Sequence, residues 1–412
     1  MNQIKLYPHQ QRALDMTQDK NRVAYYLDMG LGKTFIATEK AKQLGSKIIL
    51  IVCQKSKLED WKAHYEEYYT EYTPIIYKDI LQTIEPNTVV IINYELLVRR
   101  KELKKLRDFT LILDESSYIK NDKAQRSKFI LSMKPKNIIL LSGTPTGGKY
   151  EELYSQIKLL GWNITKTQYW NDYIDFILCR NGGIKFKKVI GYKNISKLKS
   201  KLRDYGAVFM KTDEVFELPE VFNNVISIKN TAKYKYFDKN RIVETKGIEL
   251  VGDTSLKKMM YLRQLAGLYN NHKYDKLKEL LESTEDRIII FYNFTEEYME
   301  IKELCTKLNK PISVVNGDMR DLDAYEHNDN SVVLIQYQAG AMGLNLQKSN
   351  KIIYFSLPLS SELFEQSKKR THRIGQNKAC SYYYLITKNS IEEKIFDTLK
   401  IRKDYTEALF KE

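Results

Sequence analysis

Short apolar runs alternate with longer polar, helix-compatible stretches through both halves of the chain. In the first half the apolar runs are Ala24–Leu27, Ile48–Val52, Val89–Ile92, Leu111–Leu113 and Asn137–Leu141. In the second half they are Arg287–Tyr292, Ile312–Val315, Val332–Gln336, Ile352–Phe355 and Ser381–Ile386. Runs of this length are typical of buried strands, and their alternation with helices predicts an α/β protein with two parallel sheets of about five strands each.

The stretch between the two series, roughly residues 150–275, has a helical and aromatic pattern. Leu218-Pro219 breaks the pattern, so we place the joint between two domains near residues 215–230. We expect an N-terminal domain at 1–215, with a helical protrusion at about 150–210, and a C-terminal domain at 216–412. An exposed hairpin is expected around Arg180–Ile184, where two glycines lie side by side.

Composition narrows the class of protein. The net charge is +15, from 67 Lys and Arg against 52 Asp and Glu, and an excess of this kind favours a polyanionic partner such as nucleic acid. A solvated, lysine-rich surface remains the alternative, because Lys, Asn, Ile and Tyr all have AT-rich codons. No apolar run reaches the roughly 18–20 residues of a membrane span, and the N-terminus has no signal-peptide pattern. The four cysteines form no C-x-x-C pair, so we expect a cytoplasmic protein without structural zinc.

The segment D-M-G-L-G-K-T at positions 28–34 directly follows the first apolar run and precedes a predicted helix. Glycines allow a tight turn whose N–H groups point at phosphate oxygens, and the following lysine can reach the β- and γ-phosphates. A threonine hydroxyl at the next position can hold Mg²⁺. Leu27 stands where a generic phosphate loop has glycine. The candidate nucleotide-binding residues are Met29, Gly30, Leu31, Gly32, Lys33 and Thr34, the last of them also a metal candidate.

Two adjacent carboxylates, Asp114 and Glu115, end the run Leu111–Leu113. Ligands bind at the carboxyl ends of strands in open α/β sheets. Asp114 is therefore the candidate for holding Mg²⁺, and Glu115 the candidate for orienting and deprotonating an attacking water. Together with Lys33, these residues predict hydrolysis of ATP or GTP.

Further segments resemble, in order along the chain, the motifs of the SNF2-like branch of the superfamily 2 helicases and translocases. Leu6–Gln10 resembles the glutamine motif, and DMGLGKT resembles this branch's phosphate loop, Leu27 included. The segments that resemble motifs Ia, Ib, II, III and IV are Ile51–Ser56 with Trp61, Ile92–Leu96, Asp114–Asn121, Leu141–Pro145 and Ile289–Asn293. Ala339–Leu346 resembles motif V, and Gln366–Gln376 resembles motif VI with its His-Arg-Ile-Gly-Gln ending. One departure is Ser117, which stands where the family usually has histidine.

The resemblance implies two tandem RecA-like lobes with parallel sheets and a small helical insertion between them. It implies ATP with Mg²⁺ as the cofactor, with Gln10 on the adenine edge and with Gly343 and Gln366 as further nucleotide-binding residues. It also implies catalytic arginines at Arg370 and Arg373. Spacings of four and seven residues from Gln366 would place both arginines on the same face of one helix.

The resemblance further implies translocation along double-stranded DNA, usually without full strand separation, by a motor that we expect to be monomeric and to act in a bacterial or phage-infected cell. Candidate contacts to DNA phosphates are Lys55, Ser56, Asn293 and Asn345. Two other functions stay open. One is a strand-separating DNA or RNA helicase of the same superfamily, and the other is a DNA-binding protein that uses ATP only as a switch. The direction of stepping, the pathway and any recruiting partner are open as well.

Overall fold

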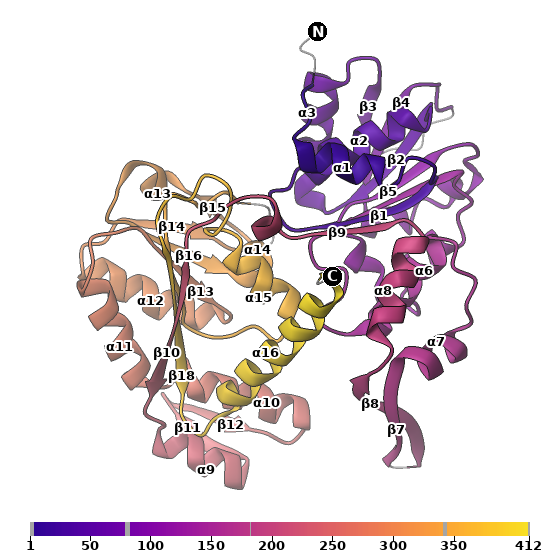
Figure 1. The fold of residues 1–412 in the computed structure, drawn as a ribbon. Helices are drawn as coiled ribbons and strands as arrows, with labels where there is room; N and C mark the ends of the chain where they lie inside the picture. The colour runs from indigo at the N-terminus through magenta and orange to yellow at the C-terminus, as the bar shows by residue number, and fades with distance from the viewer. Residues whose placement is uncertain (1–3, 79–82, 182, 341–343, 411–412) are drawn as a thin grey trace. The chain divides into compact units, whose positions relative to one another are not determined.

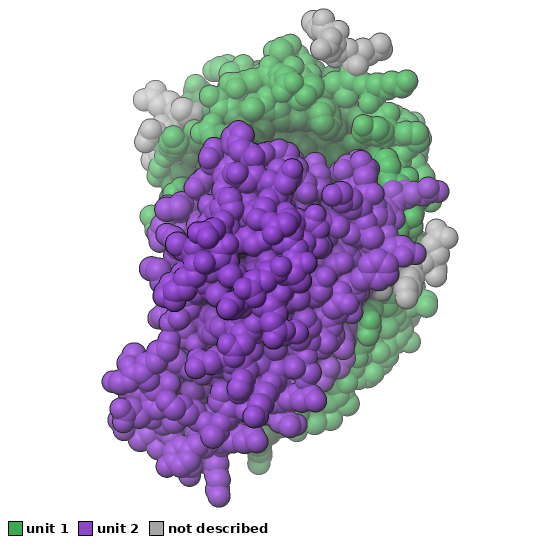
Figure 2. Space-filling model, turned by 90° about the vertical axis from the view of Figure 1, so that its left-hand side faces the viewer, with its two compact units in different colours: residues 1–216, 404–412 green, residues 217–403 purple. Residues whose placement is uncertain are grey.

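The computed structural model describes residues 4–78, 83–181, 183–340 and 344–410, drawn as a ribbon in Figure 1. The chain forms two compact units, coloured separately in Figure 2: unit 1 comprises Met1–Phe216 and Asp404–Glu412, and unit 2 comprises Glu217–Lys403. Each unit contains one seven-stranded sheet and its own helices. No helix among the described residues has the length and apolar character needed to cross a membrane.

The sheet of unit 1 is entirely parallel, in the order β3-β4-β2-β5-β6-β1-β9. The five strands expected in the first half of the chain are confirmed. The two edge strands of this sheet were not predicted: both are short, and β3 carries Pro74 and no fully buried residue. The strands are β1 (Arg22–Leu27), β2 (Ile48–Cys53), β3 (Thr73–Ile76), β4 (Thr88–Asn93), β5 (Thr110–Leu113), β6 (Asn137–Ser142) and β9 (Ala207–Met210).

Helices cover both faces of this sheet, so its strands are buried on two sides and read as continuous apolar runs. On one face lie α1 (Pro8–Asp15), α2 (Lys33–Gln43) and α3 (Leu58–Tyr68). On the other face lie α4 (Tyr94–Leu97), α5 (Gln125–Leu131), α6 (Tyr154–Leu159), α7 (Lys166–Tyr173) and α8 (Ile195–Asp204). Single 3₁₀ turns are η1 (Lys55–Lys57), η2 (Lys101–Lys105), η3 (Ser116–Ile119), η4 (Tyr150–Leu153) and η5 (Thr212–Glu214).

The region expected to be a helical protrusion also contains an antiparallel ribbon, β7 (Ile174–Asn181) with β8 (Ile184–Tyr192). Figure 1 shows this ribbon extending away from α7. Its two strands pair as far as Asn181 and Ile184, where a hairpin was predicted, but strands of this length were not predicted. Lys185 and Lys188 are exposed on β8.

The sheet of unit 2 has the order β10-β18-β17-β13-β16-β14-β15 and is parallel except for β15. The five strands expected in the second half are confirmed, and the edge strands β10 and β15 were again missed. The strands are β10 (Val221–Ile228), β13 (Ile288–Tyr292), β14 (Ile312–Val315), β15 (Arg320–Asp321), β16 (Val332–Gln336), β17 (Lys351–Tyr354) and β18 (Cys380–Thr387).

A small layer with its own apolar core precedes β13 in unit 2. It consists of α9 (Ala232–Asn240), β11 (Ile242–Thr245), β12 (Ile248–Val251) and α10 (Ser255–Ala266). The other helices are α11 (Asn271–Glu282), α12 (Thr295–Lys307), α13 (Asp323–His327), α14 (Tyr337–Gly340), α15 (Ser361–Lys368) and α16 (Ile391–Phe410).

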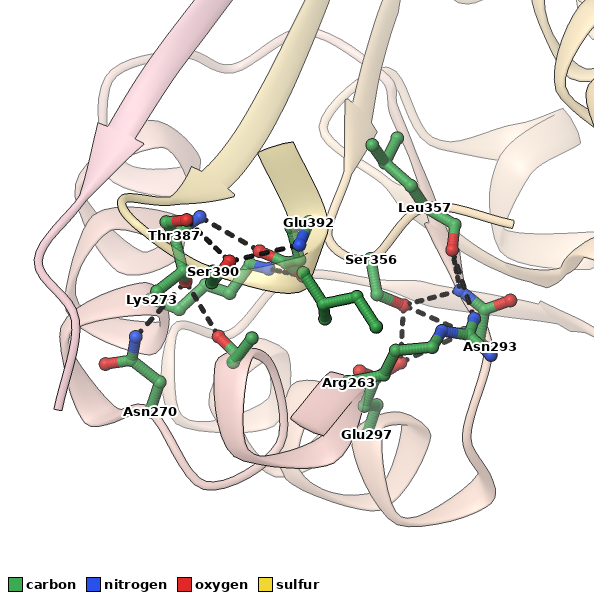
Figure 3. Close-up of polar contacts among 12 residues, drawn as sticks. Arg263, Asn270, Lys273, Asn293, Glu297, Ser356, Leu357, Thr387, Ser390 and Glu392 are labelled. Atoms are coloured by element: carbon green, nitrogen blue, oxygen red, sulfur yellow. Dashed lines mark hydrogen bonds and ion pairs between the residues drawn. The ribbon is translucent and has the colours of Figure 1, made fainter. Parts of the chain in front are cut away.

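A buried ion pair joins α11 to α16 in unit 2 (Figure 3). Lys273 Nζ lies 2.6 Å from Glu392 Oε1, and the two side chains are 0% and 4% exposed. The second oxygen of Glu392 accepts a hydrogen bond from the backbone N–H of Thr387 at 2.9 Å. The Thr387 hydroxyl in turn donates to the carbonyl of Ala266 at 2.8 Å. This chain of contacts ties α10, α11, β18 and α16 into one body.

Replacing Lys273 by methionine is expected to destabilise unit 2 by about 3–5 kcal/mol, because the Glu392 carboxylate would remain buried without its counter-ion. The double variant Lys273→Met/Glu392→Met should recover much of that loss. The measurement is the free energy of urea unfolding. Lys278→Met in the same helix is the matched control, because Lys278 pairs with Glu282 at 3.9 Å on the exposed surface. A midpoint equally low for Lys278→Met would contradict the role given to the buried pair.

Candidate active site

The predicted site residues of unit 1 lie together at the carboxyl ends of the strands of its sheet. Parallel strands end at the same edge, so the loops that follow them become neighbours. The phosphate loop follows β1, η1 follows β2, Asp114 and Glu115 follow β5, and Ser142 closes β6. The order β2-β5-β6-β1 makes these loops consecutive along the edge.

The phosphate loop has the backbone that its glycines allow. Gly30 and Gly32 have φ of 88° and 70°, in the left-handed region. A Cβ atom at Gly32 would also clash with Gln10 Nε2, so a larger residue here would displace the Gln10 side chain. Helix α2 begins at Lys33 without a side-chain cap, which leaves its N-terminal N–H groups facing the loop.

Lys33 bends back over the loop that precedes it. Its ammonium donates to the carbonyls of Leu27 at 2.7 Å and Asp28 at 3.1 Å. Burial lowers the pKa of Lys33, and the nearby carboxylates of Glu115, Asp114 and Asp28 oppose that shift. The half-buried amine of Lys33 is therefore held among carboxylates that favour its charged form.

The segment before β1 packs on the phosphate loop. The Gln10 side chain is buried, and its Oε1 accepts a hydrogen bond from the backbone N–H of Tyr7 at 2.9 Å. His9 Nε2 lies at hydrogen-bond distance, 3.1 Å, from the carbonyl of Leu31. Gln10 thus lies directly beside the loop, where its amide nitrogen faces Gly32.

The carboxylate pair is held by contacts from three neighbouring segments. Asp114 Oδ2 accepts a hydrogen bond from Trp61 Nε1 at 2.9 Å, and its backbone carbonyl accepts one from the Tyr94 hydroxyl at 2.9 Å. The Ser142 hydroxyl donates to Glu115 Oε2 at 3.3 Å. Burial raises the pKa of Asp114, while the Trp61 hydrogen bond and the Lys33 charge oppose the rise.

Glu115 has an unusual backbone. Its φ and ψ are 54° and 63°, a left-handed conformation that costs a residue with a side chain about 1–2 kcal/mol. Such a conformation persists only where the surroundings hold it. The turn that aims the Glu115 side chain is therefore fixed by neighbouring contacts.

These residues fit a nucleotide triphosphate with a divalent cation. An uncapped helix N-terminus, a glycine turn and a half-buried lysine amine are suited to phosphate. A threonine hydroxyl at Thr34 and a carboxylate at Asp114 supply the hard oxygen ligands that Mg²⁺ prefers.

In unit 2, the segments that resemble motifs V and VI lie against each other. The backbone N–H of Leu346 donates to the carbonyl of Arg370 at 3.1 Å, and Arg373 hydrogen-bonds through its guanidinium to Asn345 Oδ1. Arg370 is buried, and it donates to the carbonyl of Leu344 at 3.4 Å. Gln366 is buried in α15, and Gly343 lies outside the described residues.

One expectation for motif VI is wrong. Helix α15 ends at Lys368, so Arg370 and Arg373 do not continue its face. The Lys368 carbonyl accepts a hydrogen bond from the Tyr382 hydroxyl at 3.0 Å, and the chain then turns so that residue 370 reaches Leu346. Contacts with β18 and with the motif V segment therefore override the helical spacing.

The candidates for DNA contact differ in their surroundings. Lys55 is exposed and Ser56 half-buried in η1, after β2. Asn345 is exposed beside Arg373. The Asn293 amide is committed within unit 2: Nδ2 donates to Ser356 Oγ at 2.8 Å and to the Leu357 carbonyl at 3.0 Å (Figure 3).

Several residues that shape the site were not among the sequence candidates. Trp61 and Tyr94 lie within or beside segments that resemble motifs Ia and Ib. No feature of the nearby sequence indicates that each donates a hydrogen bond to Asp114. Asp28 Oδ2 accepts hydrogen bonds from the backbone and the side chain of Thr212, both at 3.2 Å. No sequence pattern joins residues so far apart, and only β9 pairing with β1 makes them neighbours.

The chain matches known proteins along most of its length. Residues 18–274 match the family model of the SNF2-related domain, and residues 272–375 match that of the helicase conserved C-terminal domain. The chain is 25% identical to the ISWI chromatin-remodeling complex ATPase ISW1 of Saccharomyces cerevisiae, over 97% of this chain and 40% of that protein. It is also 25% identical to the putative ATP-dependent helicase/translocase YwqA of Bacillus subtilis, over 89% of this chain and 44% of that protein.

Among solved structures, the chain is similar to the Sulfolobus solfataricus SWI2/SNF2 ATPase core in complex with dsDNA, with a TM-score of 0.46 and 19% identity over 98% of this chain and 92% of that chain. The chain spans less than half the length of the two curated relatives. The SNF2-related match alone extends over residues 18–274, which is more than half of the chain. The chain therefore belongs to the SNF2 family of superfamily 2.

Proposed function

We propose that the protein hydrolyses ATP and uses the cycle to move along double-stranded DNA. The observation that carries the proposal is the convergence of Lys33, Asp114 and Glu115 at one edge of a parallel sheet, in a chain of the SNF2 family. The printed names of the yeast and bacterial relatives, an ATPase and a putative helicase/translocase, support the activity. The net charge of +15 supports a polyanionic partner.

Phosphate binding falls to the loop of unit 1. Bound Mg²⁺-ATP supplies the scissile phosphoanhydride and a cation that neutralises charge on its phosphates. The N–H groups of residues Met29–Thr34 would surround the phosphates, the Lys33 side chain would bind the β- and γ-phosphates, and Thr34 with Asp114 would hold Mg²⁺. Gln10, buried against the same loop, is the proposed partner of the adenine edge.

Water activation falls to Glu115. Its carboxylate accepts a proton from the attacking water, and the left-handed turn together with the Ser142 hydroxyl sets where that carboxylate points. In unit 2, Arg370 and Arg373 are proposed to supply the positive charge that stabilises the transition state of phosphoryl transfer. Gly343 and Gln366 are proposed as further nucleotide contacts.

DNA binding is proposed through the phosphate backbone, without readout of base sequence. Lys55 and Ser56 in unit 1 and Asn293 and Asn345 in unit 2 are the proposed contacts. We propose a monomer that acts in the cytoplasm. The four cysteines, all within the described residues, are free thiols, which supports a reducing compartment.

ATPase rates measured side by side with duplex DNA, single-stranded DNA and RNA test the substrate. Duplex DNA is expected to stimulate the rate several-fold more than the other two, and Lys33→Ala or Glu115→Gln should lower kcat by about 100-fold or more. Lys47→Ala, an exposed residue of unit 1, is the control and should retain the wild-type rate. ATPase activity equal to that of the wild type in the Lys33 and Glu115 variants would overturn the site assignment. Unwinding of a forked but not a blunt duplex would favour a strand-separating helicase instead.

Trp61→Phe is expected to move the acid limb of the kcat/KM profile to higher pH. Burial already raises the pKa of Asp114, and the Trp61 hydrogen bond works against that rise. Because hydrolysis needs the ionised carboxylate, losing this bond raises the pKa further and activity is lost at a higher pH. Trp162→Phe is the matched control: Trp162 is a buried indole of unit 1 that stacks on Tyr205. A profile that stays in place for Trp61→Phe would contradict the importance of this bond.

A further inference from the structure

One fully buried amide in unit 1 touches three segments of the site. Gln156, in α6, has no exposed surface. Its Oε1 accepts hydrogen bonds from the hydroxyls of Ser116 at 2.8 Å and Tyr26 at 2.9 Å, and its Nε2 donates to the carbonyl of Pro145 at 2.8 Å. Tyr26 lies in β1 just before the phosphate loop, Ser116 follows Glu115, and Pro145 follows β6.

The orientation of this amide is determined by its partners. A backbone carbonyl can only accept a hydrogen bond, so the nitrogen of Gln156 must face Pro145. The oxygen must then face both hydroxyls, each of which donates to it. An apolar side chain at this position would leave two hydroxyls and one carbonyl buried without these bonds.

The contact with Ser116 bears directly on the proposed general base. Glu115 is held in a left-handed conformation that needs support from its surroundings, and the hydroxyl of the next residue is anchored on Gln156. The same amide anchors Pro145, which lies three residues after Ser142, the last residue of β6 and the donor to Glu115 Oε2. Gln156 therefore holds both segments that determine where the Glu115 carboxylate lies.

We propose that Gln156 is a positioning residue for hydrolysis: it locks the turn after β5 and the segment after β6 to each other and to the end of β1. The inference rests on the proposed ATPase function for its kinetic consequence, but its structural consequence is measurable without nucleotide. Gln156 acts through its hydrogen bonds to Ser116, Pro145 and Tyr26, none of which is among the proposed nucleotide-binding residues.

Gln156→Leu removes the acceptor and the donor at similar volume. We expect kcat for ATP to fall about tenfold or more while KM for ATP stays within about twofold, because the base is misplaced but the phosphate loop is intact. The same factor is expected with and without duplex DNA. In the free protein, hydrogen exchange should become faster at residues 114–118 and 143–147.

Gln156→Glu keeps an acceptor for both hydroxyls, and because burial favours the neutral carboxyl, its O–H can donate to the Pro145 carbonyl in place of the amide. We expect kcat to stay within about threefold of the wild type, with exchange at 114–118 and 143–147 close to that of the wild type. Ser116→Ala removes a single donor, so it tests the same link should Gln156→Leu fail to fold. It should speed exchange at 114–118 alone and lower kcat.

Asn137→Leu is the matched control. Asn137 is a buried residue at the start of β6, at the amino ends of the strands and so away from the site. Its Nδ2 donates to the Thr110 hydroxyl at 2.9 Å. It should lower the unfolding midpoint as a lost buried hydrogen bond does, yet leave kcat and exchange at both segments unchanged. Wild-type kcat and exchange in Gln156→Leu, or the same losses in Asn137→Leu, would overturn the role of Gln156. A wild-type protein without ATPase activity would instead contradict the proposed function, and the exchange data would still decide the role of Gln156.

Discussion

Parallel pairing of β2, β5, β6 and β1 brings four loops from distant parts of the chain to one edge of the first sheet. A hydrogen-bonded ladder fixes the register of each strand: Leu113 pairs with Leu140, and Tyr26 pairs with Ser142. Each loop therefore begins at a defined position along the strand direction. The positions of Lys33, Asp114 and Ser142 follow from this ladder. The strands can pair in parallel because helices cover both faces of the sheet and bury it.

Charge and burial oppose each other at that edge. Removing Lys33 from water disfavours its charged form, and Asp114 is disfavoured in the same way. Each group is partly compensated by the other and by directed hydrogen bonds, from Trp61 to Asp114 and from Lys33 to the carbonyls before it. A site assembled in this way is prepared for the charge of a triphosphate, since its dipoles are oriented before any ligand arrives.

The second unit uses buried polar contacts to connect helices to its sheet. The Glu297 carboxylate accepts hydrogen bonds from the backbone N–H of Asn293 at 3.0 Å and from the Ser356 hydroxyl at 2.7 Å, at the ends of β13 and β17 (Figure 3). Burial raises the pKa of Glu297, and these two bonds oppose the rise. The buried ion pair between Lys273 and Glu392 connects α11 to α16 in the same way. Contacts of this kind replace apolar packing where strand ends must present polar groups.

The sequence by itself determined the α/β class, ten central strands and the phosphate loop, because strands buried on both faces read as apolar runs and a left-handed turn demands glycine. It also brought out the carboxylate pair, since that pair directly follows a buried strand. Edge strands such as β3 and β10 escaped because they are half exposed and lack that pattern. Only the tertiary structure decided that α15 ends at Lys368 and that the Asn293 amide donates hydrogen bonds within unit 2. It also decided that Gln156 hydrogen-bonds to Ser116 and Pro145. These outcomes depend on hydrogen bonds between residues that are distant in sequence. Local secondary-structure propensity does not identify such partners.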